Sequence, residues 1–350
     1  MVVVVPGDLH LPFRCFVLMR AELSWSRTAT PSPVAPSWRS FCTGIVTFGR
    51  REKCKDGWVQ PLKRNIGLAF IVILLSAITP AFAASSSASI PASSPCGVAG
   101  APHYDHVVWI LLENVGYSII GSSSAPYLNG LAAACGLATN DVAVSHPSLP
   151  NYIALTSGST QGITDDGEPS THPLSSPSIF SELGSNWRSL VESMPSRCDM
   201  VTSGTYAARH NPAVYYQNLG STCPRNDVPL TLPLNLSARF TIIVPNICND
   251  MHSCPVAVGD NWLRRMVPLI LKSSQYQSHS TALFITFDEN NSEASNQVPT
   301  LVIAPSVPRG ERVGNHFTHY SLLRTSESLL HLQLLGGALT TPSMVAPFHL

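Results

Sequence analysis

The sequence predicts an α/β sandwich built around a largely parallel sheet. Four short runs are apolar, rich in β-branched residues and nearly uninterrupted, as expected for strands covered on both faces. Helical patterns lie between these runs, and such alternation is typical of α/β proteins. The expected strands are His106–Leu112, Phe240–Val244, Ala282–Phe287 and Thr300–Ala304. The expected helices are Ala125–Cys135, Ser178–Ser193, Asn261–Ser273 and Ser321–Leu335.

Polar residues at helix starts support these assignments. Ser178 and Asp260 are the expected N-caps of their helices, because their side-chain oxygens can accept from free N–H groups. The stretch from Gly158 to Ser237 has weak periodicity and many turn residues. We expect it to form excursions around the functional site.

Composition restricts the class of protein. The 350-residue chain can hold one large domain or two small ones. Its formal net charge is zero, which argues against nonspecific attraction to nucleic acid or to anionic membranes. Charged residues are sparse, whereas Pro, Ser and Thr are plentiful, as in extracellular proteins with long loops.

An export signal is expected before the folded part. Lys63 and Arg64 precede an apolar run from Ile66 to Ile78, and the small-x-small sequence Ala81–Ala83 follows. We expect cleavage after Ala83 and a secreted product, extracellular or periplasmic, without stable membrane association. An uncleaved anchor is the alternative, although the run is short for a membrane span.

These features divide the chain into four expected parts. Residues 1–62 lack clear periodicity, and we interpret them as a non-native or disordered leader created by a start codon assigned too far upstream. Residues 63–83 are the expected signal peptide, and residues 84–102 an Ala/Ser/Pro-rich linker. The folded domain is expected over 103–340. Oligomeric state is left open.

Cysteine usage agrees with export. Of nine cysteines, six lie beyond the leader, at positions 96, 135, 198, 223, 248 and 254. Proximity suggests the pairs Cys248–Cys254, Cys198–Cys223 and Cys96–Cys135, among the 15 connectivities that six cysteines allow. A zinc site is the alternative, but no C-x-x-C pair supports it.

The segment Ser145–Tyr152 (SHPSLPNY) is the strongest local signal. It places Ser148 at an expected helix start, where Pro150 is tolerated in the first turn. Free N–H groups and the helix dipole there suit a nucleophile that receives a phosphoryl group. Asn151, one turn later, can donate to a phosphate oxygen. A plain N-cap serine is the alternative interpretation.

Polar residues also follow the expected strands. In open α/β sheets, functional groups gather at the carboxyl ends of strands, so these residues are expected to converge. They are Glu113, Asn114, Asn249, Asp250, His252, Asp288, Glu289, His316 and His319. Asp250 has an equal claim to ordering the loop between Cys248 and Cys254.

Carboxylates and an amide oxygen suit one divalent cation of unknown identity; calcium, magnesium, manganese, iron and zinc remain open. Glu113, Asn114, Asp288 and Glu289 could hold it, with Ser148 as a further ligand. The metal would lower the serine pKa and neutralise phosphoryl charge, and a phosphoseryl intermediate would follow. His210 and His252 are candidates for contacting phosphate or protonating the leaving group.

Other reaction classes lack their signatures. The chain contains no G-x-S-x-G elbow, no P-loop, no dinucleotide fingerprint and no H-E-x-x-H sequence. It also lacks the interleaved basic and aromatic residues of nucleic-acid-binding proteins.

Six motifs in this order resemble the secreted phosphoesterase family of bacterial acid phosphatases and nonhaemolytic phospholipases C, within the alkaline phosphatase superfamily. The motifs together span about residues 104–337. They are Ile110–Asn114, His146–Tyr152, Arg209–Pro212, Pro245–His252, Phe287–Glu289 and His319–Thr325.

This resemblance implies a three-layer α/β/α sandwich, a bound metal and a serine or threonine nucleophile. By motif, Ser148 is similar to that nucleophile. The positions that match the metal set are Glu113, Asn114, Ser148, Asp288 and Glu289. Asn151, His210 and His252 match phosphate-pocket residues, and His319 falls in a characteristic segment. Ser253 and Phe287 depart from the family's usual aspartate and tryptophan.

The sequence therefore predicts a secreted, metal-dependent hydrolase of small phosphate esters, of the acid-phosphatase type, acting through phospho-Ser148. A phospholipase C or another phosphodiesterase is the alternative within the class. From another class, the chain could be an inactive relative that binds phosphate-bearing ligands.

Overall fold

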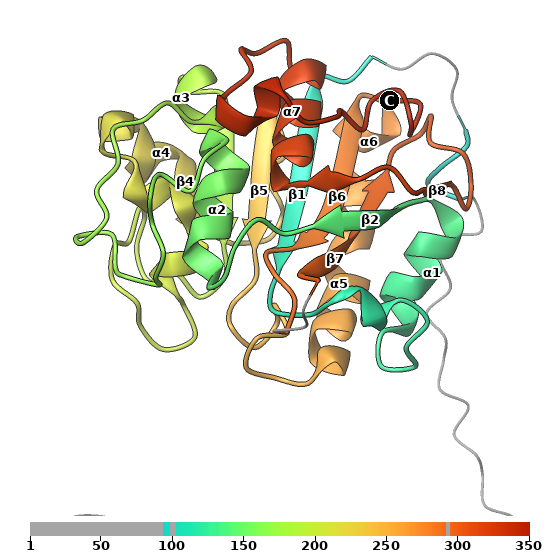
Figure 1. The fold of residues 1–350 in the computed structure, drawn as a ribbon, viewed down its shortest axis with the longest axis horizontal. Helices are drawn as coiled ribbons and strands as arrows, with labels where there is room; N and C mark the ends of the chain where they lie inside the picture. Colours follow the sequence, from blue (N-terminus) through green and yellow to red (C-terminus); the bar gives the residue numbers. More distant parts are fainter. Residues whose placement is uncertain (1–93, 99–102, 292–294) are drawn as a thin grey trace, which may run out of the picture. The chain divides into compact units, whose positions relative to one another are not determined.

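A nine-stranded sheet forms the centre of the protein, in the order β4-β3-β5-β1-β6-β7-β2-β8, with β9 paired to β2 (Figure 1). All pairs are parallel except those of β7, which runs antiparallel to β6 and β2. The strands are β1 His106–Leu112, β2 Gly136–Val142, β3 Trp187–Val191, β4 Asp227–Pro229, β5 Phe240–Val244, β6 Thr281–Phe287, β7 Gln297–Ile303, β8 Arg312–Val313 and β9 Phe317–Thr318. The predicted, largely parallel sheet is confirmed.

The structure is a computed structural model that describes residues 94–98, 103–291 and 295–350. The expected leader 1–62 and signal peptide 63–83 lie outside these residues. No helix within the described ranges is long and apolar enough to span a membrane.

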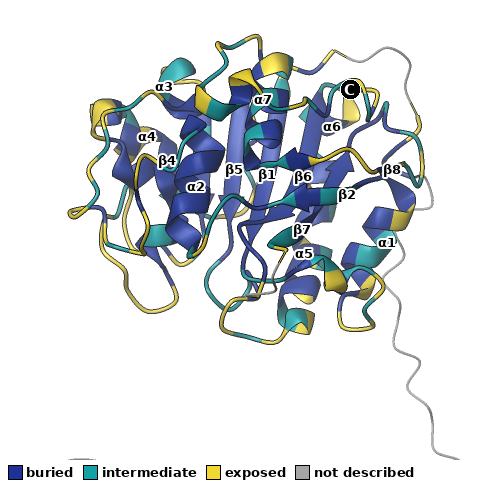
Figure 2. Cartoon of the chain, viewed as in Figure 1, coloured by how far each residue is buried: buried dark blue, intermediate teal, exposed yellow. Residues whose placement is uncertain are grey.

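Helices cover the sheet on both sides, as the sandwich prediction requires. Helices α2 and α7 lie in front of the sheet in Figure 1, whereas α5 and α6 lie behind it. The helices are α1 Pro126–Ala134, α2 Ser148–Ser157, α3 Ile179–Glu182, α4 Cys223–Asn226, α5 Val256–Leu271, α6 Ser274–Gln277 and α7 His319–Leu329. The central strands are buried along nearly their whole length (Figure 2), which explains their uninterrupted apolar sequences.

The predicted helix Ser178–Ser193 is wrong beyond its first turn. Ser178 caps α3 with a capping box, as expected, but the helix ends at Glu182. Gly184 then adopts a φ of 60°, and the chain continues as strand β3. A left-handed glycine terminates a helix, and the following residues, with Trp187 and Val191 buried, pair with β4 and β5 on either side.

Asp260 does not cap its own helix. Helix α5 begins earlier, at Val256, and Pro255 precedes it. The buried Asp260 carboxylate instead accepts from Tyr127 N at 3.1 Å and Leu128 N at 2.8 Å. It therefore caps the neighbouring helix α1 from a distance in sequence.

All three predicted disulfides are present: Cys96–Cys135, Cys198–Cys223 and Cys248–Cys254. Two segments outside residues 103–340 also pack into this unit. Cys96 is buried, and Met344 and Phe348 are fully enclosed near the C-terminus. Widely spaced apolar residues in proline- and serine-rich sequence carry no periodicity that would reveal such packing.

Candidate functional site

Strands β1 and β6 place two acidic residues side by side. The strands pair in parallel, with Leu112 opposite Phe287, so Glu113 and Asp288 leave the sheet at the same edge. Asn114 N donates to Asp288 Oδ1 at 3.0 Å, and Asp288 N donates to Leu112 O at 3.0 Å. The predicted convergence of these strand ends is present in the structure.

The loop after β5 joins the same edge through its backbone. Glu113 N donates to Asp250 O at 2.9 Å. The Asp250 carboxylate then orders its own loop, because Oδ1 accepts from His252 N at 2.8 Å. Its other oxygen, Oδ2, faces the site. Asp250 therefore both orders its own loop and contributes a carboxylate oxygen to the site, the two roles that the sequence left open.

Ser148 is the first residue of α2, and its hydroxyl points to the acidic group. Pro147 occupies the N-cap position, and its side chain makes no capping hydrogen bond. The buried Ser148 hydroxyl donates to Glu113 Oε2 at 2.9 Å instead. The plain N-cap interpretation is therefore wrong, since the hydroxyl serves Glu113 and not its own helix.

Glu113 is the centre of the site. Tyr152 Oη donates to its Oε1 at 2.5 Å, and His210 Nε2 lies 3.3 Å from the same oxygen. The rings of Tyr152 and His210 stack with centroids 5.4 Å apart. Tyr152 was within the motif but had no role in the sequence analysis. A tyrosine one helical turn after Ser148 was the available signal.

His210 lies between two carboxylates. Its Nδ1 is 3.2 Å from Asp250 Oδ2, opposite the contact with Glu113. One ligand atom from each of Glu113, His210 and Asp250 falls within 4.8 Å of the others. The histidine comes from the excursion after β3, far in sequence from both carboxylates.

Burial and mutual repulsion change the acidity of this group. Burial, followed by repulsion from Asp288 and Asp250, raises the pKa of Glu113 well above its ordinary value. Burial raises the pKa of Asp288 to about 7 and that of Asp250 to about 8. Burial lowers the pKa of His210, so its imidazole is neutral at pH 7.

A divalent cation fits these residues. Asp288 Oδ2 and Asp250 Oδ2 are buried and lack a hydrogen bond. Buried carboxylate oxygens without donors are costly, and a cation would satisfy them and relieve the repulsion between the carboxylates. Carboxylates with a neutral imidazole are ordinary ligands of divalent metals.

Glu289 and Asn151 lie beside this group. Glu289 Oε2 lies 2.8 Å from His146 Nδ1 and accepts from Asn151 Nδ2 at 3.4 Å. The buried Asn151 amide also exchanges two hydrogen bonds with the Ser145 backbone, both at 2.9 Å. Asn151 therefore holds the turn that presents Ser148. Burial raises the pKa of Glu289 to about 7.

The remaining candidates occupy different depths. His319 is buried, and its Nε2 contacts the backbone oxygen of Asp288 at 2.5 Å; burial lowers its pKa to about 4. His252 is exposed, with its ring 5.9 Å from that of His210. Asn114 lines a surface hollow of ≈ 410 Å³ together with Met251 and Val256.

His319 reaches this edge by a route that differs from the predicted one. Strand β7 is antiparallel, so its carboxyl end lies at the opposite edge of the sheet. The chain returns through β9, which pairs in parallel with β2, and α7 begins at His319. His316 lies in the connection before β9 and is exposed.

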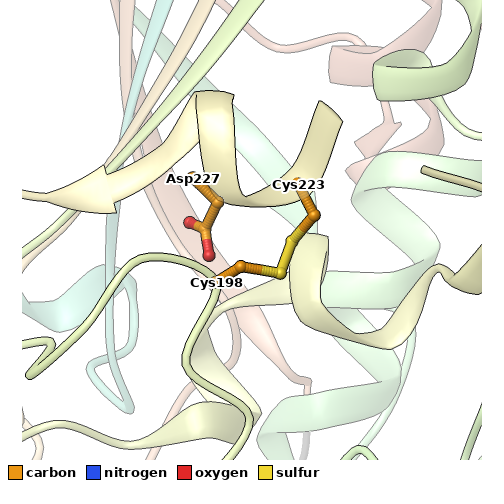
Figure 3. Close-up of side chains that lie close together, drawn as sticks. All are labelled: Cys198, Cys223 and Asp227. Carbon is orange, nitrogen blue, oxygen red and sulfur yellow. A yellow bond between two sulfur atoms is a disulfide. The ribbon is translucent and has the colours of Figure 1, made fainter. Parts of the chain in front are cut away.

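A second cluster contains Cys198, Cys223 and Asp227 (Figure 3). The two sulfurs are joined in a disulfide, so neither is a thiolate ligand. Asp227 Oδ2 accepts from Asn211 Nδ2 at 2.9 Å. This cluster stabilises the excursion that carries His210.

Comparisons with known proteins agree with this geometry. A sequence model of the Phosphoesterase family matches residues 121–333. A phosphatidylinositol-3-phosphatase of Mycobacterium tuberculosis is 33% identical over 69% of this chain and 82% of its own length. A phosphate-repressible acid phosphatase of Penicillium chrysogenum is 27% identical over 72% of this chain and 65% of its own length.

A solved structure from Vibrio parahaemolyticus, described as a protein in the alkaline phosphatase superfamily, aligns with 73% of this chain and 74% of its own. Its TM-score is 0.48 with 14% identity, and we base no inference on it. The family match and the bacterial relative are sufficient. This chain belongs to the Phosphoesterase family and is a hydrolase that acts on phosphoric esters.

Proposed function

We propose that the protein is a secreted, metal-dependent phosphomonoesterase that works through a phosphoserine at Ser148. The observation that carries the proposal is the hydrogen bond from Ser148 Oγ to Glu113 Oε2, at 2.9 Å, on the first turn of α2. It gives the hydroxyl a proton acceptor and a helix N-terminus at the same point. Both favour attack on an anionic phosphorus centre.

The cation would be held by Glu113, Asp250, Asp288 and His210, with Asn114 and Glu289 beside them. When bound, it would lower the pKa of the serine hydroxyl and neutralise charge on the phosphoryl oxygens. Asp250 and His210 were not in the predicted ligand set. Their contacts with each other and with Glu113 add them to it.

The chain's own residues account for the proton movements. The Ser148 proton passes to Glu113 Oε2 as Oγ bonds to phosphorus and the ester P–O bond breaks. His252 is exposed beside the site and donates a proton to the departing alcohol oxygen. Water then attacks phosphorus and gives one proton to His252, while the serine P–O bond breaks and Glu113 returns its proton to Ser148 Oγ. Tyr152 holds Glu113 in place throughout.

His252 sets the upper pH limit of this mechanism, and the charge of the bound cation would keep Glu113 ionised below that limit although burial raises the Glu113 pKa. Burial, then Arg209, lowers the pKa of His252 below the ordinary value, so the protonated donor form is populated only at acidic pH. His319 and Asn151 act as supports: the first contacts the Asp288 backbone and the second holds the Ser145 turn.

The names of the relatives favour a monoester. One acts on a phosphoinositide by its name, and the other is an acid phosphatase. A phospholipase C or other phosphodiesterase is the second candidate, because the hollow beside Asn114 is lined partly by apolar residues such as Val115 and Val256 and could take a second substituent.

Export is part of the proposal. Three disulfides account for every cysteine between Cys96 and Cys254, which suits an oxidising compartment. Sequencing the amino terminus of the secreted product would test cleavage after Ala83. A product that retained the Ile66–Ile78 run would contradict it.

The test of mechanism is hydrolysis of p-nitrophenyl phosphate by the chain beginning at Ala84, with divalent metal supplied. We expect Ser148→Ala to lower kcat by at least ~10³-fold, because no other group replaces the nucleophile. Ser145→Ala is the matched control, since Ser145 Oγ contacts only a neighbouring backbone oxygen among the described residues.

Near-normal turnover by Ser148→Ala would remove the phosphoserine mechanism. Turnover of bis-p-nitrophenyl phosphate in preference to the monoester would favour the phosphodiesterase. Phosphate binding without hydrolysis of either compound would indicate an inactive binding relative. Thermal unfolding of each variant must match the wild type for these results to count.

A further inference from the structure

The first turn of α2 already holds an anion that belongs to the protein. Leu149 N, directly after Ser148, donates to Asp166 Oδ1 at 3.0 Å. This N–H has no partner within its own helix and points to where the phosphoryl group of the proposed mechanism would lie. A carboxylate therefore stands where a phosphate oxygen should bind.

A cation is engaged by the same carboxylate. Arg209 Nε lies 3.6 Å from Asp166 Oδ2 and adjoins His210 in sequence. Asp166 also acts electrostatically on Glu289 and His252, which border the site. One carboxylate thus contacts the helix N-terminus and Arg209, two groups that favour an anion such as phosphate.

The loop holds Asp166 in this position from both sides. Asp165 Oδ1 accepts from Gly167 N at 2.8 Å and contacts His172 Nε2 at 2.6 Å. Gly167 O accepts from Tyr215 Oη at 2.8 Å. The backbone is anchored, whereas the Asp166 side chain is 36% exposed.

We propose that Asp166 is an internal competitor of phosphate in this site. In the free protein its carboxylate occupies Leu149 N–H and Arg209, and it withdraws when a phosphoryl group binds. It returns when the product phosphate leaves, which limits product retention. This inference rests on the proposed function, because it assigns the same site a regulator of phosphate affinity.

The test compares Asp166→Asn with wild type in p-nitrophenyl phosphate hydrolysis, with inorganic phosphate as inhibitor. Asn keeps the side chain's size but loses the charge that competes with phosphate. We expect KM and the inhibition constant of phosphate both to fall about fivefold, because the bound state no longer has to displace the carboxylate.

Asp165→Asn is the matched control. It removes the same charge one residue away, and the Asn Oδ1 can still accept from Gly167 N, so the backbone contact that positions Asp166 is kept. General repulsion of phosphate by this acidic loop predicts a similar gain in phosphate affinity in both variants. Displacement predicts the gain in Asp166→Asn alone.

Three results would overturn the inference: unchanged inhibition by phosphate in Asp166→Asn, an equal gain in Asp165→Asn, or a fall in kcat with unchanged phosphate affinity, which would place Asp166 in the chemical step. A crystal structure with inorganic phosphate bound must show Leu149 N released from Asp166. If wild type neither hydrolyses the ester nor binds phosphate, the proposed function itself fails.

Discussion

Two clusters in the described part of this protein combine a carboxylate with potential metal ligands, and they differ in which ligand atoms remain available for a metal. At Glu113, His210 and Asp250 the groups come from three distant segments, and Asp250 Oδ2 lacks a hydrogen bond. At Cys198, Cys223 and Asp227 the sulfurs already bond to each other (Figure 3). Both clusters contain a buried carboxylate oxygen without a hydrogen bond, Asp250 Oδ2 and Asp227 Oδ1, so the difference lies in the other ligands: an imidazole in the first and disulfide-bonded sulfurs in the second.

The two clusters are nevertheless connected. Asp227 accepts from Asn211, and Asn211 adjoins His210 of the other cluster. Cys198 N donates to the backbone oxygen of Asp227 at 3.1 Å, so the disulfide-linked segment holds the backbone that carries this carboxylate. The covalent cluster therefore supports the segment from which the functional cluster takes its histidine.

The largest contrast is expected between two aspartate variants. Asp288→Asn removes a buried carboxylate with a free oxygen, and we expect at least ~10-fold weaker metal binding and ~10²–10³-fold lower kcat/KM. Asp227→Asn is equally buried and should keep its wild-type metal content. Elemental analysis of the dialysed proteins measures both. Equal metal loss in both variants would show that the two carboxylates do not differ in metal binding.

Removing the Cys198–Cys223 disulfide should affect stability more than it affects metal binding. The Cys198→Ser/Cys223→Ser double variant opens a cross-link with a sequence separation of 25. We expect the free energy of unfolding to fall by about 3 kcal/mol, because the unfolded chain gains freedom. Urea unfolding gives this value. Loss of bound metal in the folded variant would show that the disulfide cluster has a direct functional role.

The smallest effect concerns pH. Burial raises the pKa of Asp288 to about 7 and of Asp250 to about 8 from an unfolded value of 3.8. The folded state thus holds these protons more tightly, so the stability that the two groups contribute is full below pH 4, falls as pH rises above about 4, and is lost once pH has passed the folded pKa values of about 7 and 8. We expect the melting temperature of the metal-free protein to decline over this range.

Adding divalent metal in the same experiment distinguishes the contributions of the two clusters to this pH dependence. It should replace the protons on Asp288 and Asp250 and reduce the decline. Burial also raises the pKa of Asp227 to about 7, and that share of the decline should persist with metal. A decline that metal leaves unchanged would contradict the assignment of Asp288 and Asp250 as ligands.

Much of the fold was predictable because strands that are buried on both faces have nearly uninterrupted apolar sequences. Strands β1 and β5 have the predicted bounds, since each is an uninterrupted apolar run. Strand β2 (GLATNDV) was missed because it is only partly buried and carries polar residues. Strand β3 was missed because its residues also fit a helical period.

Part of the site was predictable for a similar reason. Glu113, Asp288 and Ser148 adjoin strong local signals, two apolar strands and a helix start, and the structure brings them together. Other contacts join segments that are distant in sequence: Tyr152 with Glu113, Asp166 with Leu149, and His210 with Asp250. No local pattern records those contacts.

The sequence by itself determined the layered class, the family and the residues that end the central strands. These follow from hydrophobic periodicity, short-range spacing and motif order, which are properties of neighbouring residues. Only the tertiary structure decided that Ser148 donates to Glu113, that His210 lies between two carboxylates, and that Asp166 occupies Leu149 N–H. Those contacts join segments far apart in the chain, and their energies exist only once the sheet has brought the loops to one edge.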